Sequence, residues 1–167
     1  TSLIENLVKM LRPKYRIGII AGDLTTTIDR DMLKPLNVET VQVNTGRECH
    51  LDARVVGKAL QKFEGVDLLF IENVGNLICP IDFPLGAETR MVVVSVTEGP
   101  YTPLKHPYIF LGSDLAVINK TDLAPATEID LDSIENDIKK VNPGIKIART
   151  SCKMGEGIEG VVEGLGL

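Results

Sequence analysis

The sequence has 167 residues, which is enough for one α/β domain with a substantial core and too few for two ordinary domains. With 23 acidic against 18 basic residues, no Trp and only 4% aromatic residues, the composition argues against a nucleic-acid groove or a base-stacking surface. No apolar run approaches the roughly 20 residues of a membrane span and no signal peptide opens the chain, so we expect a cytoplasmic protein with neither membrane nor nucleic-acid partners.

The first third of the chain alternates short apolar runs with amphipathic stretches. Apolar residues recur at helical spacing near the start, and β-branched runs that end in Gly or Asn follow. These patterns predict a helix over 1–11, strands over 16–21 and 38–43, a brief helical piece over 29–36 and a helix over 52–63.

The central stretch, LLFIENVGNLICP at residues 68–80, is the most informative part of the sequence. Its four large apolar residues predict a buried strand over 68–71, which delivers Glu72 to the carboxyl end of a parallel sheet, where open α/β sheets bind ligands. A turn at Gly75 and a thiol at Cys79 follow within eight residues. We therefore expect this segment to connect a cation or phosphate site with a thiolate site.

The second half continues the alternation. The patterns predict strands over 91–96, 115–118 and 145–148, helices over 129–141 and 158–165, a proline-rich connection over 100–107 and a loop over 151–157. Repeated strand and helix alternation with short loops predicts a mainly parallel sheet with helices on both faces, in a single domain over residues 1–167.

The four residues that follow the strand at 115–118 fit the guanine-recognition pattern N-K-x-D. They are Asn119, Lys120, Thr121 and Asp122. A carboxylate at the last position can accept from both the ring N1 proton and the exocyclic amine of guanine, while the lysine stem lies over the base. Alone, the pattern is equally compatible with a polar turn.

A second loop lies where a guanine-binding domain places its other base-contacting segment. Ser151, Cys152 and Lys153, with glycines at 155 and 157, follow one helix and one strand after the first loop. The backbone of such a loop faces the guanine oxygen. Because two matching loops occur in the right chain order, nucleotide binding is favoured over the polar-turn interpretation.

Acidic residues near the strand ends are candidates for Mg²⁺ binding. Glu72 and Gly75 resemble a D-x-x-G element with Glu in place of Asp, in which the acid holds Mg²⁺ and the glycine amide senses the terminal phosphate. Asp29 is our candidate for a second Mg²⁺-binding or water-positioning acid. The alternative for Glu72 is a solvated acid at a strand end.

The phosphate-binding loop G-x-x-x-x-G-K-[ST] does not occur in this sequence. Thr1 and Ser2 in front of an amphipathic helix are what should follow the lysine of such a loop. We expect the first strand, its glycines and its lysine to lie upstream, and catalysis depends on them.

Two cysteines and one histidine form a candidate metal site. Cys49, His50 and Cys79 offer two thiolates and an imidazole, which suit Zn²⁺ or Ni²⁺ and leave one coordination position open. Adjacent residues need a local turn to face one ion, and a symmetric partner could add ligands. The alternative is that the cysteines are core thiols and His50 lies at a helix end. Cys152 and His106 are not expected to be ligands.

These segments together resemble the HypB family of hydrogenase nickel-incorporation GTPases. The resemblance spans essentially the whole chain and depends on NTGRECHLDA at 44–53, IENVGNLICP at 71–80, INKTDLA at 118–124 and SCKMGEG at 151–157. The related urease accessory GTPase UreG should show Cys-Pro-His and Glu-Ser-Gly-Gly elements, and this chain shows neither.

The resemblance implies a P-loop GTPase that uses GTP and Mg²⁺, dimerises with GTP bound and carries nickel or zinc at the dimer interface. It implies a HypA-type nickel chaperone and the hydrogenase large subunit as partners. The implied roles are Mg²⁺ binding by Thr1, Asp29 and Glu72, guanine reading by Asn119, Lys120 and Asp122, and metal ligation by Cys49, His50 and Cys79. The alternatives are a metal-dependent dimerisation module and an accessory GTPase for another nickel enzyme such as urease.

Overall fold

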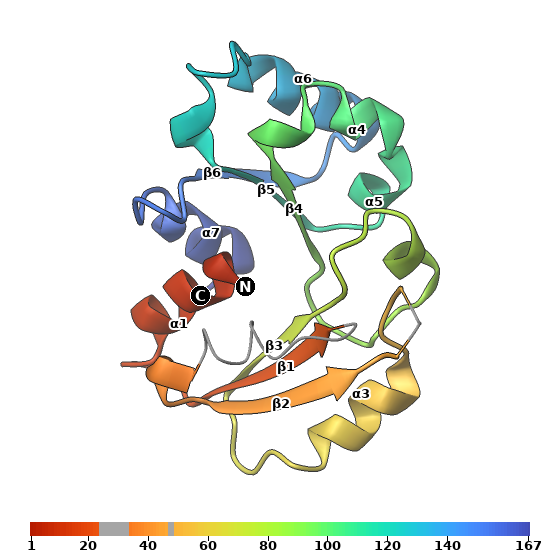
Figure 1. The fold of residues 1–167 in the computed structure, drawn as a ribbon, viewed down its shortest axis with the longest axis vertical. Coiled ribbons are helices and arrows are strands. Elements are labelled where there is room, and N and C mark those ends of the chain that lie inside the picture. The colour runs from red at the N-terminus through yellow and green to blue at the C-terminus, as the bar shows by residue number, and fades with distance from the viewer. Residues whose placement is uncertain (24–33, 47–48) are drawn as a thin grey trace. The chain divides into compact units, whose positions relative to one another are not determined.

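The computed structural model describes residues 1–23, 34–46 and 49–167, which fall into two compact units, Thr1–Ala87 and Glu88–Leu167 (Figure 1). Each unit contains a three-stranded parallel sheet. The parallel α/β class is thus confirmed, although the expected sheet is present as two. The prediction of a single domain stays a prediction.

The sheet of the first unit has the order β2-β1-β3. Its strands are β1 (Ile17–Asp23), β2 (Glu39–Asn44) and β3 (Leu68–Glu72). The central strand β1 is apolar from Ile17 to Ala21 because neighbouring elements bury both of its faces. In the register, Asp23 pairs with Asn44 and Ala21 with Glu72, so polar residues gather where the strands end.

Two α-helices are described in this unit, α1 (Ser2–Leu11) and α3 (Ala53–Leu60), together with the 3₁₀ turns η1 (Lys34–Leu36) and η2 (Cys79–Asp82). α1 buries its apolar stripe as predicted. α3 ends earlier than the predicted residue 63, because the amides of Lys62 and Phe63 bond three residues back and tighten the last turn. Of the predicted helical piece at 29–36, only the part that forms η1 lies within the described ranges.

The sheet of the second unit has the order β4-β5-β6, formed by β4 (Met91–Ser95), β5 (Leu115–Asn119) and β6 (Lys146–Thr150). Residues 115–118 of the central strand have no exposed surface. Helices α4 (Thr102–Lys105) and α6 (Leu131–Val141) lie on one face and α7 (Ile158–Leu165) on the other (Figure 1). The 3₁₀ turn η3 (Val96–Glu98) follows β4 directly, and η4 (Thr121–Leu123) follows β5 after Lys120.

The proline-rich stretch at 100–107 is not merely a connection, and that prediction was wrong. It contains α4 and leads into α5 (Pro107–Leu111). Pro103 and Pro107 sit in the first turns of these helices, where a missing amide proton costs little and the fixed φ suits the helix. In the part of the chain that the structure covers, no helix is long and apolar enough to cross a membrane.

Candidate functional site

The carboxyl end of β3 brings Glu72 against Thr1, the residue that precedes α1. The Thr1 hydroxyl donates to Glu72 Oε1 at 2.8 Å, and the Thr1 amino nitrogen donates to the same oxygen. The other carboxylate oxygen, Oε2, is buried and finds no hydrogen-bond partner among the described residues. A buried carboxylate oxygen without a donor is costly unless a cation binds it. Together with the hydroxyl, it fits the oxygen ligands that Mg²⁺ prefers.

Asp29 and Gly75 are the other two residues predicted to lie near the nucleotide phosphates. Asp29 lies outside the described residues. Gly75 is exposed in the bend after β3, and a Cβ added there would meet nothing within 4 Å. Local packing therefore does not demand glycine at this position, and the role of its amide in phosphate sensing stays a prediction.

In the second unit, Asn119 at the end of β5 ties the two predicted base-contacting loops together. Its Oδ1 accepts from the Thr150 hydroxyl and from the Cys152 amide, both at 3.1 Å. Thr121, two residues on, donates from its hydroxyl to the carbonyl of Thr150 at 3.1 Å. The loops at 119–122 and 151–153 thus form one hydrogen-bonded structure at the carboxyl edge of this sheet.

The acid of the N-K-x-D pattern is oriented by the second loop. The Ser151 hydroxyl donates to Asp122 Oδ1 at 2.6 Å, and Ser151 itself is fully buried. Lys120 adopts a left-handed conformation with φ 63°, which turns the chain between Asn119 and Asp122. Lys120, Asp122 and Lys153 are exposed and can reach a ligand.

The loop at 151–157 is closed by its own backbone. The Ser151 amide donates to the Glu156 carbonyl, and the Glu156 amide donates back to Ser151, both at 3.1 Å. Gly157 has φ 73°, and a Cβ there would lie 2.0 Å from the carbonyl oxygen of Arg149. Burial raises the pKa of the Cys152 thiol, which therefore stays protonated at neutral pH.

Cys49 and His50 lie close together, with 3.8 Å between Cys49 Sγ and His50 Nδ1. The local turn that adjacent ligands require is therefore present. The His50 ring stacks on Phe83, with 3.5 Å between the ring centroids and 19° between the planes. Phe83 directly follows η2, so the segment that contains Cys79 approaches His50 through this aromatic contact.

Cys79 begins η2 and is held by the side chain of Asn76. Asn76 Oδ1 accepts from the amides of Ile78 at 2.7 Å and Cys79 at 3.2 Å, and its Nδ2 donates to Cys79 Sγ at 3.5 Å. Among the described residues, no three His, Cys, Asp or Glu side chains come together as a metal site. The set of Cys49, His50 and Cys79 as ligands therefore stays a prediction.

Sequence reasoning missed Asn73 and Asn76. Asn73 follows Glu72, and its Oδ1 accepts from the amides of Leu51 at 2.8 Å and Val74 at 2.9 Å. Asn is favoured where a side-chain oxygen accepts from nearby amides in a turn, so two asparagines within four residues of the strand end were a usable signal. The bond to Leu51, 22 residues away, has no sequence signal.

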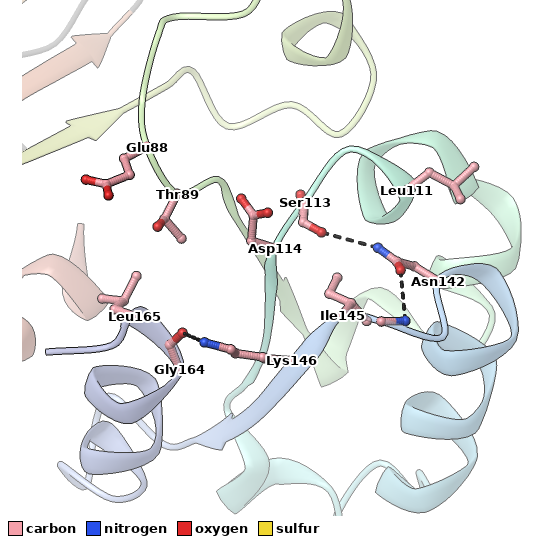
Figure 2. A pocket seen from close by; sticks show the side chains of 11 residues that line it. Glu88, Thr89, Leu111, Ser113, Asp114, Asn142, Ile145, Lys146, Gly164 and Leu165 are labelled. Atoms are coloured by element: carbon pink, nitrogen blue, oxygen red, sulfur yellow. Dashed lines mark hydrogen bonds between the residues drawn. The ribbon is translucent and has the colours of Figure 1, made fainter.

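A polar cavity of about 490 Å³ lies at the amino ends of the strands in the second unit's sheet, opposite the edge where the two loops meet (Figure 2). Its lining includes Asn142 and Lys146, whose side chains donate to backbone carbonyls at Phe110, Ser113 and Gly164. Asp114 Oδ2 accepts from the Arg90 amide at 2.8 Å. These polar groups hold the amino ends of the strands in place, so we regard the cavity as structural.

A parallel α/β fold with an N-K-x-D loop bonded to a second loop at the carboxyl edge defines a nucleotide-binding protein. Residues 1–149 match the family described as CobW/HypB/UreG, nucleotide-binding domain. Within it, the chain belongs to the HypB family of hydrogenase maturation factors, because it is 49% identical over 165 residues to the probable hydrogenase maturation factor HypB of Methanocaldococcus jannaschii. That match covers 98% of this chain and 75% of the relative.

Other relatives and solved structures agree. HypB of Azotobacter chroococcum is 44% identical over 95% of this chain, but the chain spans only 52% of that protein. The crystal structure of HypB from Archaeoglobus fulgidus superposes with a TM-score of 0.91 at 43% identity, covering 98% of this chain and 80% of that one. HypB from Helicobacter pylori in complex with nickel gives 0.90 at 32% identity, covering 98% and 78%.

Proposed function

We propose that this chain binds and hydrolyses GTP and delivers nickel during maturation of a nickel-iron hydrogenase, as a GTP-dependent homodimer with an interfacial metal site. The observation that carries the nucleotide part is the bonded pair of loops in which Asn119 accepts from the Cys152 amide and Asp122 from the Ser151 hydroxyl. Family membership and the nickel complex of the Helicobacter pylori relative support the metal part.

Guanine is read by the second unit. The Asp122 carboxylate accepts from the N1 proton and the exocyclic amine of the base, and Ser151 holds that carboxylate in place. The stem of Lys120 covers the base plane. The Cys152 amide already donates to Asn119 Oδ1, so the neighbouring Lys153 amide is the candidate donor to the guanine oxygen.

Mg²⁺ is held in the first unit by the Thr1 hydroxyl and the buried Glu72 carboxylate, whose Oε2 the protein itself leaves unpartnered in the described residues. When bound, the ion neutralises the charge that develops on the phosphates. Hydrolysis further depends on a phosphate-binding loop.

Nickel is the cargo, and Cys49, His50 and Cys79 are its proposed ligands. Thiolate and imidazole suit Ni²⁺ or Zn²⁺, and a two-fold dimer would present the set twice. Release on hydrolysis then follows from rearrangement of these ligands.

The test is gel filtration and nickel stoichiometry of the full-length protein with a GTP analogue or GDP. We expect a dimer with the GTP analogue and loss of most bound nickel in Cys49→Ala and Cys79→Ala. His106→Ala is the control, because this second histidine lies between α4 and α5 and is not a proposed ligand. Unchanged nickel in both cysteine variants contradicts the metal site. Metal-driven dimers that ignore nucleotide favour the dimerisation module.

One observation favours a second recipient. HypB of Helicobacter pylori, 35% identical over 95% of this chain, is named a hydrogenase/urease maturation factor. Binding assays with a purified hydrogenase large subunit, a urease apoprotein and a HypA-type chaperone distinguish the recipients. Nickel-dependent binding to urease alone would favour the accessory GTPase for urease.

A further inference from the structure

Leu51 is a buried core residue of the first unit and directly follows the proposed nickel ligands Cys49 and His50. Its side chain has no exposed surface and belongs to the core cluster that includes Ile20 and Val56. It also packs on Gly22 of β1, where an added Cβ would lie 2.8 Å from Leu51 Cγ and 3.0 Å from the carbonyl oxygen of Glu72. Residue 51 therefore cannot move without disturbing the ends of β1 and β3.

The backbone of Leu51 is tied to the proposed Mg²⁺ side by one hydrogen bond. Its amide donates to Asn73 Oδ1 at 2.8 Å, and Asn73 is the residue directly after Glu72. The same oxygen accepts from the Val74 amide at 2.9 Å. Because the peptide unit is planar, this bond fixes the peptide plane that joins His50 to Leu51.

This connection is shorter than the chain path through residues 72–79. From Glu72 it runs through one peptide bond to Asn73, across one hydrogen bond to Leu51 and through one peptide bond to His50. The path to Cys79 crosses an exposed bend at Gly75 and a separate turn held by Asn76. A shift of Glu72 therefore reaches the Cys49–His50 pair first.

We propose that Asn73 is a positioning residue that couples occupancy of the Thr1–Glu72 site to the geometry of the Cys49–His50 pair. The inference depends on the proposed function, because it takes the first site to hold the Mg²⁺ of GTP and the second to ligate nickel. Mg²⁺ bound at Glu72 sets the position of Asn73, and Asn73 sets the peptide plane next to His50. Because coupling is reciprocal, nickel at the pair also changes nucleotide affinity.

The experiment measures the ratio of nickel dissociation constants of the full-length protein with Mg²⁺–GTP analogue and with Mg²⁺–GDP. We expect a ratio between about 5 and 150 for the wild type, which is the usual range of such coupling. Asn73→Ala removes the acceptor, so its ratio of nickel dissociation constants should fall to within about twofold of one. Its nickel affinity without nucleotide should change by a smaller factor than this ratio does. Asn73→Asp keeps the acceptor and should retain most of the ratio.

Asn76→Ala is the matched control in the same loop. Asn76 makes similar side-chain bonds to nearby amides and also contacts Cys79 Sγ, but it does not contact Leu51 in the bonds the structure shows. We expect nickel affinity to fall by a similar factor in both nucleotide states, so that the ratio remains that of the wild type. A loss of ratio equal to that of Asn73→Ala overturns the specific role of Asn73.

A measurement without nickel completes the test. Exchange of the Leu51 amide proton should differ between the Mg²⁺–GTP-analogue and Mg²⁺–GDP states of the wild type, and this difference should disappear in Asn73→Ala. A folded Asn73→Ala protein with the wild-type ratio overturns this inference and leaves the proposed function intact. A wild-type ratio of one overturns the coupling itself. If Asn73→Ala does not fold, an unchanged Leu51 exchange rate in the wild type still overturns the inference.

Discussion

In the proposed function, the side chain of Asp122 decides which base the second unit accepts. A carboxylate accepts two hydrogen bonds from guanine, whereas an amide at this position presents one acceptor and one donor. Asp122→Asn should lower GTP affinity by roughly 10- to 200-fold, because one hydrogen bond to guanine is lost and the amide donor faces the exocyclic amine donor. It should gain affinity for xanthosine triphosphate, whose carbonyl replaces the exocyclic amine. Competition binding with both nucleotides measures the change.

Asp122 is exposed, so the same variant should keep the stability of the wild type within experimental error. Ser151→Ala is the companion variant, because it removes the 2.6 Å bond to Asp122 without altering the carboxylate. It should weaken GTP binding without shifting the preference toward xanthine. An Asp122→Asn variant that keeps the wild-type preference for GTP over xanthosine triphosphate would contradict this role of Asp122.

Asp52 makes helix α3 sensitive to acid. It is the N-cap, and the hydrogen bonds from the amides of Val55 and Arg54 lower the pKa of its carboxyl below the ordinary 3.8. Because the folded pKa is the lower one, the stabilisation is complete above the unfolded pKa and is lost as pH falls through the folded pKa. The free-energy difference between wild type and Asp52→Asn should therefore shrink as pH falls below about 4.

Asn is the matched substitution at Asp52 because it still caps the helix but does not titrate in this range. Urea unfolding of both proteins from pH 7 down to the acid limit measures the difference, and acid effects common to both cancel. A difference that stays constant across this range would contradict the assignment.

At the scale of elements, the turn that joins β6 to α7 requires glycine at 157. Its φ of 73° is unfavourable for other residues, and an added Cβ would lie 2.0 Å from the Arg149 carbonyl oxygen. Gly157→Ala should therefore cost at least about 3 kcal/mol of unfolding free energy and weaken GTP binding, because the 151–153 loop shifts with it.

Gly166 provides the control for this turn. It ends α7 with φ 77°, and an added Cβ there meets nothing within 4 Å. Gly166→Ala tests the backbone conformation without the clash and should cost about 1 kcal/mol. Chemical unfolding of both variants measures the two values. A cost for Gly157→Ala as small as that for Gly166→Ala would show that the turn relaxes around the new methyl group.

The strands were predictable from sequence because burial on both faces leaves continuous apolar runs such as 115–118. The positions of the two loops proposed to contact the base were predictable, because their places after β5 and β6 follow from chain order; their contact with a base stays a prediction. By contrast, α4 and α5 were missed because proline was weighted as a breaker, although it suits a first turn. The bond from Leu51 to Asn73 could not be predicted, because it depends on tertiary packing across 22 residues.

At the scale of the whole molecule, the chemistry is divided between the two units. The first holds Thr1, Glu72 and the candidate nickel ligands, and the second holds both loops proposed to read the base. Sequence motifs located these groups, but they did not predict that the strands form two sheets. Crossover connections, and not local sequence patterns, set which strands are neighbours in a parallel sheet. The increase in unfolding free energy on nucleotide binding therefore tests the proposed groups of both units in one protein.

Nucleotide binding should raise the unfolding free energy of the full-length protein by about 2.7 kcal/mol at a GTP-analogue concentration 100 times its dissociation constant. Part of this increment should require Mg²⁺ and disappear with a chelator, because Glu72 Oε2 is buried without a partner in the described residues until a cation binds it. Glu72→Gln keeps an oxygen for the Thr1 hydroxyl but removes the charge, so only the Mg²⁺-dependent part should be lost.

Asp122→Asn serves as the opposite control, because at the same nucleotide concentration it should remove about half of the increment or more, whether or not Mg²⁺ is present. Thermal or urea unfolding of the three proteins, each with nucleotide and with or without chelator, separates the two contributions. If Glu72→Gln retains the full Mg²⁺-dependent increment, another residue holds the ion. The unpartnered oxygen of Glu72 would then have to be explained by local strain or by ordered water, not by a cation.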